Sequence, residues 1–201
     1  MFVSFDGVDG TGKSTQVGLF VEWLRAQGRE VVQCRDPGST SVGDELRKIL
    51  LHRVDLQLAR RSEMFLYMAA RSQLVEEVIR PALAAGKTVV SDRYLLANIV
   101  YQGYAGGMDV ETIRQVGQVA TDGLWPDLTI VLDLPAATAA ARIQRGFDKM
   151  ESQGMKFLED VRQGFLQEAP RLGDRVRILD ADGTREEVHE RVVAAWRSAA
   201  G

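Results

Sequence analysis

Short apolar segments alternate along the chain with longer segments in which apolar residues recur every three or four positions. The apolar segments have the length of buried strands and lie at residues 1–5, 30–34, 87–91, 128–132 and 176–179. The segment after the first strand has helical spacing, and Gly28 is expected to end that helix. A long helix at 59–80 is expected to stop near Pro81. Further helices are predicted at 42–51, 95–104, 110–122, 136–145, 157–168 and 186–196.

The regular alternation of strands and helices is typical of an α/β protein. It predicts a five-stranded parallel sheet with helices on both faces, and 201 residues suit one domain better than two. Polar segments follow the strand ends at residues 6–15, 35–40, 92–94 and 180–184. Because ligands bind beyond the carboxyl ends of parallel strands, we expect these four segments to converge on one edge of the sheet.

Charge and composition exclude several classes of partner. The formal net charge is −3, with 25 Lys and Arg against 28 Asp and Glu, so no general basic surface for nucleic acid is expected. The one cysteine, Cys34, excludes an internal disulfide and fits a reducing compartment. No signal peptide and no stretch of about 18 apolar residues is found, so we expect a cytoplasmic protein without a membrane partner.

The glycine-rich segment G-V-D-G-T-G-K-S-T after the first strand fits the Walker A pattern of a phosphate-binding loop, the P-loop. Its glycines let successive backbone N–H groups turn toward a phosphate, and the following helix N-terminus adds its dipole. Lys13 is expected to reach the β- and γ-phosphates of a nucleotide, and Ser14 to ligate Mg²⁺. The predicted ATP-binding residues of this loop are Gly7, Val8, Asp9, Gly10, Thr11, Gly12, Lys13, Ser14 and Thr15.

The P-loop alone does not separate GTPases, ATPases and small-molecule kinases. The chain has no N-K-x-D motif that would read guanine, which disfavours a GTPase. A mechanical ATPase usually has a hydrophobic run that ends in paired acids, whereas here the third strand continues as V-V-S-D-R-Y.

Further motifs make the chain resemble a thymidylate kinase of the nucleoside monophosphate kinase type. They are R-D-P-G-S-T at 35–40, M-A-A-R at 68–71, D-R-Y at 92–94 and N-I-V-Y-Q-G at 98–103. The resemblance extends to the strand W-P-D-L-T-I-V-L-D-L and to the segment V-R-Q-G-F-L. It implies a P-loop kinase fold with a short lid, and Mg²⁺-dependent transfer of the γ-phosphoryl group of ATP to dTMP, giving dTDP. It also implies a homodimer.

The resemblance assigns several residues to the acceptor nucleotide. Arg93 would clamp its phosphate and Arg35 would approach the same phosphate, since paired guanidinium groups match phosphate oxygens. The carboxylate of Asp9 would accept a hydrogen bond from the 3′-hydroxyl. The full dTMP-binding set is Asp9, Arg35, Pro37, Tyr67, Arg71, Arg93, Asn98, Tyr101 and Gln102.

The thymine base would contact two helices. Arg71 would donate to a thymine carbonyl, and Tyr67, one helical turn earlier, would stack on the base in place of the family's usual Phe. Asn98, Tyr101 and Gln102 resemble residues that read the thymine edge and crowd the 2′ side of the sugar. A partly buried structural aromatic is the alternative for Tyr101.

Four further residues have separate expectations. Asp36 stands where the family usually has Glu, which leaves its role open. Asp92 ends a strand beside the P-loop and would contact the metal through water; its surface ion pair with Arg93 is the alternative for that arginine. Phe65 is expected in the core, because it lies two residues from Tyr67. His52 is expected at the surface or in a structural role.

The polar segment at about 142–154 is expected to be a lid that closes over the phosphates, with an incidental solvated loop as the alternative. Some family members carry an arginine in the P-loop at the position of Gly10, and others supply cations from the lid. The glycine places this chain in the second group and makes Arg145 and Lys149 catalytic candidates beside Lys13 and Arg93. Arg142 and Asp182 would complete the ATP site.

Two other functions stay open. One is a related P-loop kinase, either a deoxynucleoside kinase or a broader pyrimidine monophosphate kinase. The other is an ATP-binding switch that has no acceptor substrate. The cluster of acceptor-binding residues argues against the switch.

Overall fold

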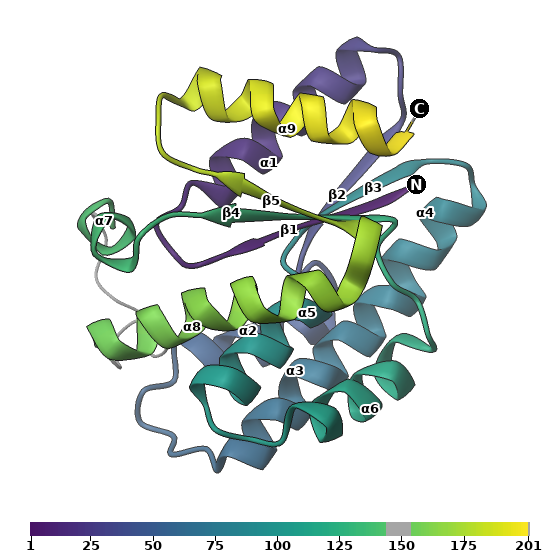
Figure 1. Cartoon of the computed structure of the whole chain (residues 1–201). Coiled ribbons are helices and arrows are strands. Elements are labelled where there is room, and N and C mark those ends of the chain that lie inside the picture. Colours follow the sequence, from purple (N-terminus) through teal and green to yellow (C-terminus); the bar gives the residue numbers. More distant parts are fainter. Residues whose placement is uncertain (144–153, 201) are drawn as a thin grey trace.

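The computed structural model describes residues 1–143 and 154–200, and its centre is a five-stranded sheet in which the paired strands run parallel. The strand order is β2-β3-β1-β4-β5 (Figure 1). The strands are β1 (Phe2–Gly7), β2 (Val31–Arg35), β3 (Thr88–Asp92), β4 (Leu128–Asp133) and β5 (Val176–Asp180). The predicted fold class and all five predicted strands are confirmed.

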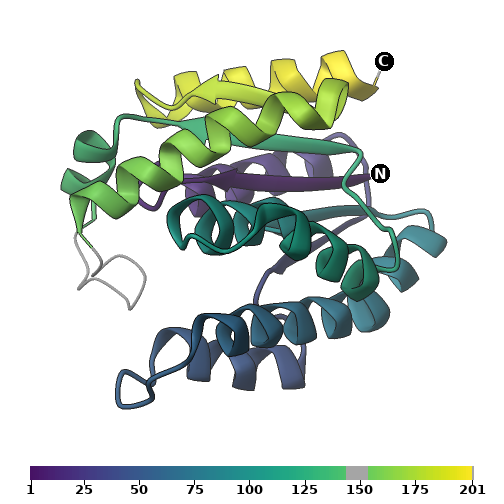
Figure 2. The same ribbon diagram turned by 60° about the horizontal axis from the view of Figure 1, so that its bottom comes forward.

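Helices cover both faces of the sheet, as the sequence pattern predicted. They are α1 (Lys13–Ala26), α2 (Ser41–Leu51), α3 (Arg60–Leu74), η1 (Val75–Ile79), α4 (Arg80–Ala84), α5 (Leu95–Asn98), η2 (Ile99–Ala105), α6 (Val110–Thr121), α7 (Ala136–Ala141), α8 (Met155–Glu168), η4 (Ala169–Arg175) and α9 (Arg185–Ala200). Helices α1 and α9 pack on one face, and α3, α5, α6 and α8 lie on the other side (Figure 1). Figure 2 shows α2 and α3, drawn in blue, as the outermost layer on that side. In the described ranges no helix has both the length and the apolar character needed to cross a membrane.

The predicted helix stop near Pro81 is wrong, because the helical path continues through that residue to Ala84. The segment just before it, η1, is a π-helical turn, in which the N–H of Arg80 bonds to the carbonyl of Val75, five residues earlier. Proline lacks an N–H and crowds the carbonyl four residues before it. The wider turn comes at that point of the helix, and Pro81 then occupies the first turn of α4, where proline is tolerated.

The expectation that Phe65 belongs to the core is also wrong, since 51 % of this residue is exposed. The inward face of α3 carries Met64, Met68 and Arg71, all of which are buried and follow helical spacing. An offset of two residues from Tyr67 predicts a different direction, but it does not tell which of the two directions is inward.

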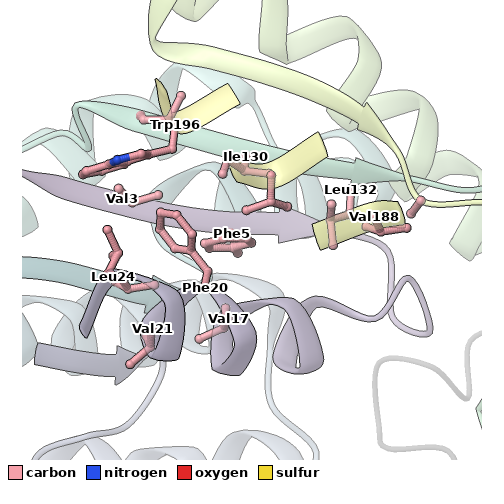
Figure 3. Close-up of a cluster of buried hydrophobic side chains, with 14 of the residues drawn as sticks. Val3, Phe5, Val17, Phe20, Val21, Leu24, Ile130, Leu132, Val188 and Trp196 are labelled. Carbon is pink, nitrogen blue, oxygen red and sulfur yellow. The ribbon is translucent and has the colours of Figure 1, made fainter. Parts of the chain in front are cut away.

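The core beneath α1 and α9 is built around Phe20, which is fully buried (Figure 3). Its ring lies 5.6 Å from that of Phe5 on β1 and 5.5 Å from that of Trp196 on α9, measured between centroids. Along β4, Ile130 belongs to this cluster, whereas the next residue, Val131, packs into the cluster on the opposite face. Burial of both faces makes the sheet a firm base for the loops at its edge.

Val21→Ala should lower the free energy of unfolding by about 2 kcal/mol, because it removes two methyl groups from the packed face of α1. Val21 is 1 % exposed and Val54 is 77 % exposed, so Val54→Ala is the matched control and should change the value by less than about 0.5 kcal/mol. Urea unfolding followed by circular dichroism measures both variants. Equal losses in the two would contradict the packing of α1.

Candidate active site

A cavity of about 830 Å³ opens at the carboxyl ends of β1, β2 and β3. The predicted residues that line it are Asp9, Gly10, Gly12, Lys13, Ser14, Thr15, Arg35, Pro37, Tyr67, Arg71, Asp92, Arg93, Asn98, Tyr101, Gln102 and Arg142. Four other predicted residues that the structure describes, Gly7, Val8, Thr11 and Asp182, are not among the lining residues. Arg145 and Lys149 lie outside the described residues. The strand-end segments after β1, β2 and β3 thus converge as expected.

Gly10 is required by the backbone of the P-loop and by the helix beside it. Its φ is +89°, in the left-handed region that favours glycine. A Cβ atom at this position would overlap the backbone carbonyl oxygen of Ala139 in α7. An arginine therefore does not fit here without movement of α7, and this position of the loop contributes no cation.

Lys13 begins α1 and is held in place by the loop that it follows. Its Nζ donates to the Val8 carbonyl at 2.8 Å and lies 3.4 Å from Asp9 Oδ1. Only 6 % of the side chain is exposed, and burial, with the nearby Arg93, lowers the pKa of Lys13. The ammonium group is thus fixed at the cavity wall before any anion binds.

Arg93 comes from the end of β3 and meets the same carboxylate. Its Nη2 donates to Asp9 Oδ1 at 2.6 Å and to the Tyr101 hydroxyl at 3.1 Å, and its guanidinium lies 4.9 Å from the centre of the Tyr101 ring. The ion pair of Arg93 is thus with Asp9 rather than with Asp92, the partner considered from the sequence. Burial opposes ionisation of Asp9, but Arg93 and Lys13 hold the pKa of this carboxyl well below its usual range.

The backbone at Arg93 is strained in order to aim the side chain. Its φ is +70°, a region that costs a non-glycine residue roughly 1–2 kcal/mol. Two hydrogen bonds to the Arg93 backbone hold this conformation: the Arg93 N–H donates to the Phe5 carbonyl at 2.8 Å, and the Ser91 hydroxyl donates to the Arg93 carbonyl at 2.7 Å. Strain of this kind is typical of functional positions.

Ser14 and Asp92 supply oxygen atoms on the P-loop side of the cavity. The Ser14 hydroxyl donates to Asp92 Oδ2 at 2.7 Å. Hydroxyl and carboxylate oxygens suit Mg²⁺, which binds proteins through one or two such ligands and completes its shell with water and substrate phosphates. Ser14 and Asp92 fit that mode, because they place one hydroxyl and one carboxylate together beside the P-loop.

Asp36 is a structural partner of Arg71, which gives this residue the role that the sequence left open. Arg71 Nε donates to Asp36 Oδ2 at 2.5 Å, and both side chains are almost fully buried. Burial raises the pKa of Asp36, and Arg71 opposes that effect. Arg71 Nη1 also donates to Asn98 Oδ1 at 2.8 Å, so the arginine that was expected to contact thymine is held rigidly at the cavity floor.

The structure adds cavity residues that the sequence did not indicate. Arg47 on α2 lines the cavity and donates to the Pro37 carbonyl at 2.9 Å, while Arg35 is half exposed and pairs with Asp44 at 3.1 Å. Arg47 follows Asp44 by three positions, so helical spacing places the two on one face of α2. The sequence does not show that this face meets the cavity. The remaining lining residues are Asp36, Leu51, His52, Ala97 and Ile143.

The fourth strand-end segment reaches the site through Arg142. The guanidinium donates to the Ala181 carbonyl at 3.2 Å and to Asp182 Oδ1 at 3.3 Å, while Arg142 itself lines the cavity. Asp182 therefore orients a cavity residue without lining the cavity.

Asp6 lies directly beneath the P-loop with no exposed surface. Its Oδ1 has no hydrogen-bond partner among the described residues. Burial raises the pKa of Asp6 to about 7, although Arg93 and Lys13 partly oppose the effect. A neutral carboxyl group is thus favoured in the fold at moderately acidic pH.

Comparison with known proteins identifies relatives along almost the whole chain. The thymidylate kinase family model matches residues 5–192. The thymidylate kinase of Rhodopirellula baltica is 47 % identical over 192 residues, covering 96 % of this chain and 78 % of that protein. That of Kosmotoga olearia is 42 % identical, covering 96 % and 93 %. That of Bifidobacterium longum is 45 % identical, covering 94 % and 93 %.

Asp6→Asn should become increasingly stabilising, relative to the wild type, as the pH rises from 4 to 8. The native state binds more protons at Asp6 than the unfolded chain between pH 3.8 and about 7, so this carboxyl group costs stability as the pH rises through that window. The difference in unfolding free energy should shift by up to about 4 kcal/mol. Urea unfolding at several pH values without nucleotide or metal measures it, and a difference that stays constant with pH would contradict the prediction.

Proposed function

The chain belongs to the thymidylate kinase family, and from that premise we propose how its residues divide the work of phosphoryl transfer. The enzyme phosphorylates dTMP to dTDP with ATP as the phosphoryl donor. The observation that supports the residue roles best is the placement of Lys13 and Arg93 on one oxygen of Asp9. These two cations follow the ends of different strands. Two anionic substrates must be brought together in the site, so positive charge is needed where their phosphates meet.

The donor side of the cavity is the P-loop. Its backbone N–H groups and the N-terminus of α1 would bind the phosphates of ATP, and Lys13 would neutralise charge on the β- and γ-phosphates. Arg142 would contact the adenine or the phosphates, with Asp182 holding its guanidinium. Mg²⁺ would supply charge neutralisation between the phosphates, held by Ser14 directly and by Asp92 through water.

The acceptor side is formed by Arg93 with Arg35 and Pro37. Arg93 would bind the dTMP phosphate, because its strained backbone and its bond to Asp9 fix its guanidinium at the cavity wall. Arg35 would leave Asp44 to join it, since that exposed ion pair is weak. Asp9 would accept a hydrogen bond from the 3′-hydroxyl of dTMP.

The thymine would lie against the buried floor of the cavity. Arg71 would donate to a thymine carbonyl, and Asn98 and Gln102 would bind the base edge. Tyr67 would stack on the ring, and Tyr101, held by Arg93, would crowd the sugar.

We further propose that residues 142–154 act as a lid of the single kinase domain, with Arg145 and Lys149 as the cations that meet the transferred phosphoryl group. The absence of a side chain at Gly10 supports this division, because the P-loop has no cation of its own at that position. A cytoplasmic homodimer is proposed from the family alone.

An acceptor panel tests the function. With ATP as donor, kcat/KM for dTMP should exceed that for CMP by at least about 100-fold, because polar groups of a base site left unpaired by the wrong base discriminate strongly. UMP has the same ring N–H and C4 carbonyl as dTMP, so its lower kcat/KM should come from the 2′-hydroxyl that Tyr101 would crowd. Thymidine should not be phosphorylated, since it lacks the phosphate that Arg93 binds. Turnover of thymidine without turnover of dTMP would contradict the role of Arg93 and favour a deoxynucleoside kinase. Steady-state rates of ADP release measure all acceptors.

Lys13→Ala should lower kcat by at least about 100-fold, because it removes a preorganised cation from the developing charge of the transferred group. Lys156→Ala is the matched control: Lys156 is 88 % exposed and pairs with Asp160, so its loss should leave kcat within about twofold. A kcat of the Lys13 variant that equals the wild type would remove this lysine from the mechanism.

A further inference from the structure

A chain of hydrogen bonds crosses the floor of the cavity and runs in one direction. Arg71 Nη1 donates to Asn98 Oδ1 at 2.8 Å, and Asn98 Nδ2 donates to Gln102 Oε1 at 2.5 Å. Gln102 Nε2 then donates to Glu63 Oε1 at 3.1 Å. Glu63 and Arg71 lie on α3, and the two amides lie on α5 and η2, so the chain joins two helical segments.

The groups at the two ends of this hydrogen-bond chain, Arg71 and Glu63, fix the orientation of the two amides that lie between them. A guanidinium group can only donate hydrogen bonds, and an ionised carboxylate can only accept them. Asn98 must therefore turn its oxygen to Arg71, and its nitrogen then faces Gln102. Gln102 must in turn present its oxygen to Asn98 and its nitrogen to Glu63. A reversed Gln102 amide would set two donors against each other at Asn98 and two acceptors against each other at Glu63.

Burial makes such a reversal unfavourable. Asn98 is 3 % exposed and Gln102 is 4 % exposed, so a mismatched group on either amide has little access to water. Both residues also line the cavity, which means that their direction decides what a bound base meets. The donor–acceptor order is therefore set before the substrate enters.

The fixed order matches thymine rather than cytosine. Each amide nitrogen uses one of its two N–H groups in the chain, and Gln102 Oε1 has a second lone pair. Thymine presents a ring N–H and a C4 carbonyl, which need an acceptor and a donor. Cytosine presents a bare ring nitrogen and a C4 amino group, which need the reverse. A Gln102 amide turned around would offer the cytosine pattern.

We propose that Glu63 is a positioning residue that locks the direction of Gln102 and thereby favours a pyrimidine with a C4 carbonyl over one with a C4 amino group. Glu63 does not line the cavity and acts through Gln102. The inference rests on the proposed binding of dTMP at this floor and adds a residue that sets base selectivity from outside the cavity.

Glu63→Gln tests the inference, because it keeps the size of the side chain and removes its restriction to accepting. KM for dTMP should rise roughly three- to tenfold, the cost of one hydrogen bond that is no longer fixed. The values of kcat and of KM for ATP should stay within about twofold. The ratio of kcat/KM for dTMP over dCMP should fall by at least the same factor as KM rises.

Glu77→Gln is the matched control, because Glu77 accepts from Gln73 in the same manner but on an exposed surface of the continuing helix. It should leave all four quantities at their wild-type values. In a Gln102→Leu background, Glu63→Gln should have no further effect on KM for dTMP, since its route to the base is gone.

Three results would overturn the inference. The first is an unchanged KM and selectivity in Glu63→Gln. The second is a fall in melting temperature and in kcat together with a rise in KM for ATP, which indicates a purely structural role. The third is an undiminished effect in the Gln102→Leu background. Failure of the wild type to phosphorylate dTMP would instead refute the proposed function, so the two failures are distinguishable.

Discussion

The site depends on one carboxylate placed between two cations. Asp9 Oδ1 contacts both Lys13 Nζ, at 3.4 Å, and Arg93 Nη2, at 2.6 Å. Two cations so close to a common point repel each other, and the single negative charge between them offsets that repulsion while leaving the trio with a net positive charge. An anion in a phosphate-binding loop is thus consistent with phosphate binding, because it holds the cations in place in the absence of substrate.

The parallel sheet brings these charges together. In the register of β1 and β3, Phe5 pairs with Asp92, so the P-loop and Arg93 leave neighbouring strands at the same height. The Arg93 N–H then bonds to the Phe5 carbonyl, which ties Arg93, the proposed ligand of the acceptor phosphate, to the strand that carries the P-loop. Packing on both faces of the sheet keeps that register, because a slip by one residue would turn every core side chain of the strand to the other face. The packing of the hydrophobic core and the geometry of the active site therefore depend on the same strands.

The sequence predicted the strands, the P-loop and most of the cavity, because these depend on local patterns. Contacts between residues far apart in the sequence were harder to predict: Asp9 and Arg93 are 84 residues apart, and Asp36 and Arg71 are 35 residues apart. No local pattern shows which guanidinium or amide a carboxylate meets, and for that reason the contacts of Asp36 with Arg71 and of Glu63 with Gln102 emerged only from the structure. The Pro81 error had a different cause, since a π-helical turn accommodated the proline within a continuing helix.

The dependence of substrate binding on Asp9 is the most direct test of the role given to this carboxylate. Asp9→Asn keeps the shape of the side chain and removes its charge, and steady-state kinetics give KM for both substrates. Arg93 is the more closely paired cation, and Lys13 keeps its bond to the Val8 carbonyl, so binding of the acceptor should weaken more than binding of the donor. We expect KM for dTMP to rise at least about tenfold, as for a lost charged hydrogen bond, with KM for ATP within about twofold. A rise in KM for ATP with an unchanged KM for dTMP would contradict the central role given to this carboxylate.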